Sequence, residues 1–139
     1  MAKQIIFSDS ISITEIKDPK LDDWIKITLE ECKKKDKGVA VSNIGGYQTK
    51  PFLNKEITEL LGGPTARAVK DFTDTRFKFQ MLNVWINENY KYSYNNCHFH
   101  AASHYSGVYY LKVPKDSGQL RFHRTDATAF LNLYDFYKT

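Results

Sequence analysis

The sequence predicts an α+β fold in which helices come first and antiparallel strands follow. Apolar residues recur at helical spacing through the first half of the chain. From Phe77 onward they alternate, and the five residues between Val113 and Gln119, PKDSG, are typical of a hairpin connection. We expect the 139 residues to form a single domain, residues 1–139, with a helical part at about 17–76 and a β-barrel part at about 77–139.

The first helix has clear signals at both ends. Residues 4–16 mix isoleucine and phenylalanine with polar residues and predict an extended segment. Asp18 then provides a good N-cap, and Pro19 suits the first helical turn, where its missing N–H costs nothing. Gly38 is the expected stop, because glycine accepts the left-handed conformation that often ends a helix.

Two further helices are expected after a short strand. Residues 39–42 predict that strand, and Gly45-Gly46 predicts a turn after it. Asn54 is the expected cap of the second helix. Gly62-Gly63-Pro64 is expected to break that helix and to start a third, which fades near Thr73–Thr75.

The second half of the chain predicts strands. Both alternating faces of residues 77–86 are apolar, which predicts a strand covered on two sides. Residues 106–113 and 119–123 predict two more strands joined by the hairpin connection. The high aromatic content, with nine Tyr, nine Phe and two Trp, suits strands and large packed cores.

Charge and cysteine content exclude few classes of function. The net charge of +4 is partly local, since Lys33, Lys34, Lys35 and Lys37 cluster where the first helix should end and would oppose its dipole. No spacing of basic and aromatic residues marks a nucleic-acid site. Two cysteines distant in sequence, a short apolar N-terminal run and no span long enough for a membrane predict a cytoplasmic protein.

The most informative pattern is a pair of histidines, His98 and His100, in CHFHAASHYSGVYYLKVP. In an extended strand both side chains would share one face, with Cα atoms about 7 Å apart. Imidazole is a common ligand for Zn, Fe, Cu and Ni, so the pair could hold a metal ion at the mouth of a β-barrel. The alternative is two structural histidines that face solvent or bond to neighbours.

A third ligand is less clearly marked. His104 completes the pattern H-x-H-x3-H and could give a cupin-like site with three histidines and one open position. Non-haem iron oxygenases instead use two histidines and one carboxylate. His100 stands where that scheme expects the carboxylate, and a neutral ligand there leaves the site more positive.

The stretch WINENYKYSYNNCHFHAASHYSGVYYLKVPKDSGQLRFH, together with VSNIGG at residues 41–46, resembles a family of small 2-oxoglutarate/Fe(II)-dependent oxygenases of marine bacteria and their phages. The resemblance covers roughly residues 40–124. It implies a jelly-roll fold, also called a double-stranded β-helix and shared with cupins, with helices packed outside it. It also implies Fe(II) and 2-oxoglutarate as cofactors.

The same resemblance raises two expectations about completeness. Family members continue with a distal metal-binding histidine and an arginine for 2-oxoglutarate, and nothing after Phe122 resembles that part. We therefore expect an incomplete barrel that lacks its last strands. A second copy of the chain could complete it, or the apolar tail at residues 129–139 could cover the open edge. Tyr109 and Tyr110 should point to opposite faces, so one of them, which we take as Tyr110, could contact the co-substrate; a core aromatic is the alternative.

Three functions remain open from the sequence. The leading one is a 2-oxoglutarate/Fe(II)-dependent oxygenase that hydroxylates a small molecule or peptide and that is inactive alone if its barrel is incomplete. The second is a non-catalytic jelly-roll module for binding or assembly, in which the histidines are structural. The third is a cupin-like metal protein that uses His98, His100 and His104.

Overall fold

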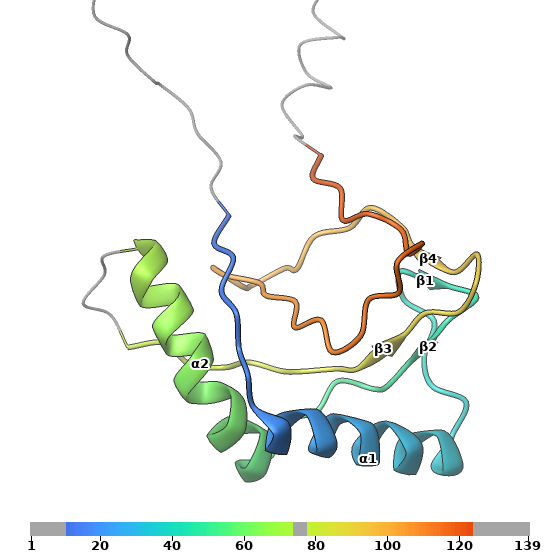
Figure 1. Cartoon of the computed structure of the whole chain (residues 1–139), viewed down its shortest axis with the longest axis horizontal. Helices are drawn as coiled ribbons and strands as arrows, with labels where there is room; N and C mark the ends of the chain where they lie inside the picture. The colour runs from blue at the N-terminus through green and yellow to red at the C-terminus, as the bar shows by residue number, and fades with distance from the viewer. Residues whose placement is uncertain (1–10, 74–77, 124–139) are drawn as a thin grey trace, which may run out of the picture.

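The computed structural model describes residues 11–73 and 78–123. Within them, two helices, α1 (Pro19–Lys35) and α2 (Lys55–Thr73), contact each other and accompany two small antiparallel sheets. The α+β class is therefore confirmed. Figure 1 shows α1 along the lower edge, α2 rising beside its first turns and the strands above the other end of α1. The strands of the described part do not form a jelly roll, which stays a prediction.

Helix α1 begins where the sequence predicts. The Asp18 carboxylate accepts hydrogen bonds from the backbone N–H groups of Lys20 (3.0 Å) and Leu21 (3.3 Å), which satisfies two of the free donors of the first turn. The helix ends at Lys35, and the N–H of Asp36 donates to the Cys32 carbonyl. Gly38 follows with φ of +74°. A Cβ atom there would also lie 2.5 Å from the Gln48 carbonyl oxygen, so the position requires glycine.

Helix α2 corrects the prediction of two short helices. Asn54 caps it as expected, because its side-chain oxygen accepts from the N–H of Ile57 at 2.9 Å. The helix then runs through Gly62, Gly63 and Pro64 without a break. An internal proline removes one hydrogen bond and favours a kink, but it does not end a helix whose packing compensates for the loss. Ile57 supplies part of that packing, since its side chain is completely buried.

The strands pair two segments that lie far apart in the sequence. β1 (Asn43–Ile44) pairs with β4 (Tyr94–Asn95), and β2 (Tyr47–Gln48) pairs with β3 (Asn87–Glu88), both antiparallel. Hydrogen bonds extend this pairing at both ends, from Asn96 N–H to the Ser42 carbonyl (2.8 Å) and between Phe52 and Val84. Residues 42–52 thus lie beside residues 84–96 over most of their length.

Gly45 and Gly46 bend the first of these segments between β1 and β2. Gly45 has φ of +74°, and a Cβ atom on Gly46 would lie 2.8 Å from the Asn89 side-chain oxygen and 2.9 Å from the Glu88 carbonyl oxygen. The predicted turn is therefore a bend within one paired segment. The strand expected at residues 39–42 is wrong, since the strands begin at Asn43.

The remaining predicted strands are not found in the described part of the chain. Residues 106–113 and 119–123 have no partner strand there, although the connection between them forms a turn in which the Ser117 N–H donates to the Pro114 carbonyl at 3.0 Å. The segment before β3 is not covered on both sides either, because Phe79 and Leu82 are 39% and 54% exposed. An alternating pattern of apolar residues predicts an extended backbone, but it does not provide the neighbouring strand with which that backbone must pair.

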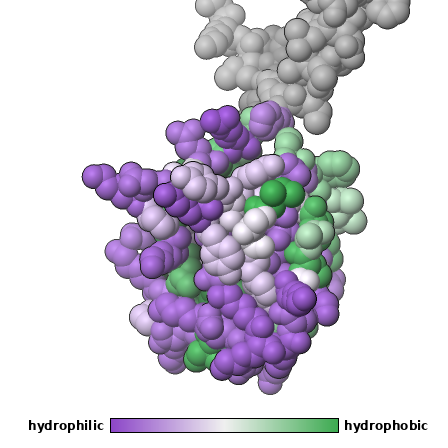
Figure 2. Space-filling model, turned by 90° about the vertical axis from the view of Figure 1, so that its right-hand side faces the viewer, coloured by the Kyte–Doolittle hydropathy of each residue, from purple (hydrophilic) through white to green (hydrophobic). Residues whose placement is uncertain are grey.

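The buried core is small and lies where the helices meet the paired segments. Leu21 of α1, Ile57 of α2 and Tyr47 of β2 are its apolar members, and Asn43, Gln48 and Thr49 are buried polar residues beside them. Figure 2, which views the side of the strands, shows a mostly hydrophilic surface over α1, with hydrophobic side chains in separate patches. No helix in residues 11–73 or 78–123 is long and apolar enough to cross a membrane.

Candidate metal site

His98 and His100 lie side by side with their outer ring nitrogens facing each other. The Nε2 atoms are 3.2 Å apart, and the ring centroids are 5.1 Å apart at an interplanar angle of 44°. The intervening Phe99 is 88% exposed, whereas His100 is partly buried. The structure therefore brings the two predicted ligands together, although residues 98–100 belong to no assigned strand.

The inner nitrogen of each ring is held by a separate hydrogen bond. His98 Nδ1 donates to the Asn96 carbonyl at 2.7 Å, and His100 Nδ1 lies 2.7 Å from the Ser106 hydroxyl. In a metal-binding histidine, the ring nitrogen that does not face the metal usually makes a hydrogen bond to another group of the protein. This hydrogen bond fixes the orientation of the ring. Both rings of this pair have that arrangement.

The strand pairing positions the site. Asn96 ends the paired segment. Its N–H donates a hydrogen bond to the Ser42 carbonyl, and its own carbonyl accepts one from His98 Nδ1. A turn at Ala101-Ala102 then reverses the chain, with Ala102 at φ of +60°, and this return allows Ser106 to reach His100. Asn96, the last paired residue, and Ser106, four residues after the turn, thus each hold one histidine.

The environment of His100 favours the form that binds metals. The ring packs edge-on against Trp85, with centroids 5.1 Å apart at an angle of 83°. Partial burial, and to a smaller extent the neighbouring His98, lower the pKa of His100 below its usual value. A lower pKa keeps the imidazole neutral, and only a neutral imidazole offers a lone pair to a metal ion.

The spacing of the Nε2 atoms fits a shared metal ion. Two ligands at about 2.1 Å from one metal lie about 3.0 Å apart in neighbouring octahedral positions and about 3.4 Å apart in a tetrahedron. The observed 3.2 Å falls between these values. The donor set therefore fits two positions of a divalent transition metal such as Fe(II) or Zn(II).

The other predicted site residues do not join the pair in the described residues. No group of three or more His, Cys, Asp and Glu side chains there could hold a metal ion, so the structure does not bring His104 to the pair, and its role as a ligand stays a prediction. Tyr110 is 57% exposed. Tyr109 turns to α1, where its hydroxyl donates to the Asp22 carboxylate at 2.6 Å.

Sequence reasoning missed the residues that orient the rings. Ser106 belongs to the Ser-Gly-Val-Tyr-Tyr block, but nothing in that block indicates that its hydroxyl reaches His100. The Asn96 carbonyl is a backbone group and leaves no signal in the sequence. Trp85 lies thirteen positions before His98, and no residue pattern indicates that its ring reaches His100.

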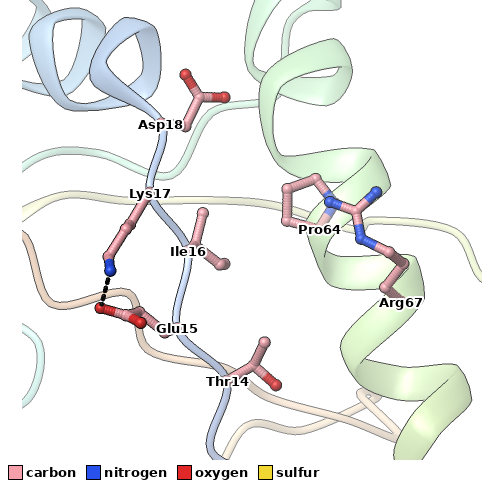
Figure 3. Close-up of a pocket in the computed structure, with 7 residues that line it drawn as sticks. All are labelled: Thr14, Glu15, Ile16, Lys17, Asp18, Pro64 and Arg67. Atoms are coloured by element: carbon pink, nitrogen blue, oxygen red, sulfur yellow. Dashed lines mark ion pairs between the residues drawn. The ribbon is translucent and has the colours of Figure 1, made fainter.

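Two pockets of the described chain lie away from the histidine pair. One, of about 190 Å³, is formed by residues 14–18 together with Pro64 and Arg67 of α2. Figure 3 shows Ile16 pointing toward Pro64 and the ion pair between Lys17 and Glu15. A second, of about 400 Å³, lies between α1 and residues 47–56. Neither contains His98 or His100.

The two facing imidazoles fit a histidine-based metal site, and a comparison with protein families points to a metal-dependent class. Residues 83–136 match a family described as "Putative 2OG-Fe(II) oxygenase", a family that uses Fe(II) and 2-oxoglutarate. The match contains both histidines, Trp85 and Ser106. No curated protein and no solved structure matches the chain.

The extent of the match corrects the extent of the resemblance described above. It begins at residue 83, so VSNIGG at residues 41–46 lies outside it. It continues to residue 136, so the expectation that nothing after Phe122 resembles the family is wrong. Residues 124–136 of the match lie outside the described part of the chain.

Proposed function

We propose that His98 and His100 bind Fe(II) and that the chain acts as a 2-oxoglutarate/Fe(II)-dependent oxygenase of the hydroxylase type. The observation that carries this proposal is the 3.2 Å contact between the two Nε2 atoms, with both Nδ1 atoms engaged elsewhere. Two rings whose outer nitrogens face each other, while their inner nitrogens bond to other groups, are suited to a common metal ion. The family match over residues 83–136 supplies the identity of the metal and co-substrate.

The proposal assigns simple tasks to the residues of this chain. His98 and His100 would hold the metal, while Asn96, Ser106 and Trp85 would keep the rings in place. Bound Fe(II), with 2-oxoglutarate and O₂, would supply the oxidising chemistry of the family. The same proposal includes a jelly roll formed by residues 77–139, with the helices outside it. It also includes a reducing cytoplasmic setting, which suits the free thiols of Cys32 and Cys97.

The charge of the site is consistent with a dianionic co-substrate. Two neutral imidazoles leave the full +2 charge of the metal uncompensated, where a carboxylate ligand would have removed one unit. The two carboxylates of 2-oxoglutarate would restore the balance. We assign the hydroxyl of Tyr110 to a carboxylate of this co-substrate, and His104 to the third ligand position in the cupin-like version of the site.

Metal titration tests the proposal directly. Co(II) or Ni(II) is added to metal-free protein under nitrogen, with and without 2-oxoglutarate, and the absorption spectrum is recorded. We expect binding that is lost in His98→Ala and in His100→Ala, and a spectrum that shifts when 2-oxoglutarate is added. Binding lost in His104→Ala would favour the cupin-like site. No metal binding by the unchanged protein would contradict both readings.

A second function, a non-catalytic module for self-assembly, is favoured by one observation. Several large apolar side chains within and after the histidine pair are exposed in the described chain, among them Phe99, Val108, Leu120 and Phe122. A second copy of the chain could cover them and pair with residues 106–113. Light scattering after size-exclusion chromatography would then give a dimer mass, and a monomer at all concentrations would exclude this function.

A further inference from the structure

The hydrogen bonds of the histidine pair define where the protons lie. A carbonyl oxygen can only accept, so the contact with the Asn96 carbonyl requires a proton on His98 Nδ1. In a neutral ring the other nitrogen then carries a lone pair. His98 Nε2 is therefore an acceptor, and it already points at His100, which is also the direction required for metal binding.

The proton on His100 follows from the same rule. Its Nε2 lies 3.2 Å from His98 Nε2, which carries a lone pair, and this contact is a hydrogen bond only if His100 Nε2 carries the proton. His100 Nδ1 is then bare, and the Ser106 hydroxyl donates to it at 2.7 Å. Without metal, the two histidines are thus opposite tautomers.

A shared metal ion requires a different arrangement. Both Nε2 atoms must then present lone pairs, so His100 has to carry its proton on Nδ1. The number of protons does not change, because the Nε2 proton leaves to solvent and Nδ1 takes one up. Ser106 can follow this change, since a hydroxyl has one donor and two acceptor sites and can rotate from donating to accepting.

We propose that Ser106 is a positioning residue whose hydroxyl holds His100 in both tautomers, as a donor in the metal-free site and as an acceptor in the metal-bound site. The metal-bound half of this inference rests on the proposed function, whereas the metal-free half rests on the contacts alone. Asn96 contrasts with Ser106, because its carbonyl permits one tautomer of His98 and keeps that ring ready for metal.

The tautomers can be read from the ¹⁵N chemical shifts of the ring nitrogens in histidine-labelled protein at pH 8, where ordinary imidazoles are neutral. For the metal-free protein we expect the proton on Nδ1 of His98 and on Nε2 of His100. Adding Zn(II), which is diamagnetic, should move the His100 proton to Nδ1 and leave His98 unchanged. A proton on His100 Nδ1 in the metal-free protein would overturn the inference.

Variants of Ser106 test its part in metal binding. Ser106→Ala should weaken Zn(II) binding by roughly ten-fold to a hundred-fold, the usual effect of losing such a contact, and should give a mixture of His100 tautomers. Ser106→Thr keeps the hydroxyl and should restore both properties. Ser103→Ala, a change at an exposed serine in the same loop, is the matched control and should alter neither.

The outcomes separate this inference from the proposed function. If the unchanged protein binds no Zn(II), Co(II) or Ni(II), the proposed function fails, while opposite tautomers in the metal-free protein would still uphold the first half of the inference. If metal binds but Ser106→Ala has the same affinity and the same single His100 tautomer as the unchanged protein, the assignment of Ser106 is wrong although the metal site stands. The labelled spectra of the unchanged protein decide the metal-free half even if Ser106→Ala does not fold.

Discussion

The Tyr109 hydroxyl donates a hydrogen bond of 2.6 Å to the Asp22 carboxylate, which joins the segment after the histidine pair to helix α1 across 87 positions of sequence. This contact holds residues 106–113 against the helices, although they have no strand partner in the described chain. Ser106, three residues earlier, bonds to His100. The placement of the candidate site therefore depends on a helix near the start of the chain.

The first prediction concerns this contact. Tyr109→Phe removes the donor but keeps the ring, so unfolding in urea should show a loss of about 1–2 kcal/mol, the usual range for a partly exposed bond to a charged acceptor. Tyr110→Phe, at an exposed neighbour, should change the free energy of unfolding by less than about 0.5 kcal/mol. Equal losses in both variants would contradict the role of the bond.

The same bond predicts a dependence on alkaline pH. The hydrogen bond to Asp22, with partial burial, raises the pKa of Tyr109 from 10.0 to about 12. Because the folded pKa exceeds the unfolded one, the stabilisation is complete below pH 10 and is lost as the pH rises to about 12. The pKa values of Tyr47 and Tyr90 are also raised, by burial and by the Glu88 carboxylate respectively. Tyrosinate absorbance should therefore show one late-titrating tyrosine fewer in Tyr109→Phe than in the unchanged protein.

A second prediction concerns acid stability. The Glu88 carboxylate pairs with Lys33 of α1, and this bond, followed by that from the Tyr90 hydroxyl, lowers the pKa of Glu88 below its usual value of 4.5. A lowered folded pKa means that the stabilisation is present above pH 4.5 and is lost as the pH falls through the folded value. Glu88→Gln should therefore cost about 0.5–1 kcal/mol at pH 7 and less at pH 3. Glu15→Gln, in the exposed pair with Lys17, is the control and should have no such dependence.

The sequence could predict local features that a few neighbouring residues decide. Asp18 and Asn54 cap helices because their own side chains reach the first N–H groups, and no distant residue takes part. The contact of His98 with His100 is local in the same sense. The sequence could not show that residues 42–52 pair with residues 84–96, because alternation reveals a strand but not its partner. The contacts of Ser106 and Trp85 with His100 were missed because they depend on how the chain turns after Asn96, which no residue pattern indicates.

The unbroken α2 gives a third prediction. Gly62 lies inside the helix, and a Cβ atom there would meet nothing within 4 Å. Gly62→Ala should therefore raise the free energy of unfolding by about 0.5–1 kcal/mol, since alanine loses less backbone entropy in a helix. Gly38→Ala should do the opposite, because φ is +74° and the Gln48 carbonyl blocks the space. A destabilised Gly62→Ala protein would favour the two short helices that the sequence alone predicts.

A fourth prediction concerns the buried Thr49, which is only 2% exposed. Its hydroxyl accepts a hydrogen bond from the Ile86 N–H at 3.0 Å, while its own N–H donates to the Ile86 carbonyl. Thr49→Val keeps the shape but leaves the Ile86 N–H without a partner, so it should cost about 1–3 kcal/mol. Thr49→Ser keeps the hydroxyl and should lose only about 0.8 kcal/mol for the missing methyl group. If Val is tolerated better than Ser, the hydroxyl does not hold the strands together.

The last prediction links metal binding to stability. A ligand that binds the folded chain alone raises the free energy of unfolding, by about 2.7 kcal/mol when its free concentration is a hundred times the Kd. Zn(II) or Ni(II) should therefore raise the melting temperature of the metal-free protein, and His98→Ala or His100→Ala should abolish the shift, since each leaves a single imidazole. His123→Ala, at an exposed histidine in the described chain, should keep the full shift. Metal binding to histidines of the unfolded chain would only reduce the shift. A shift that persists in both single variants would therefore mean that the ion binds elsewhere and that the 3.2 Å pair is structural.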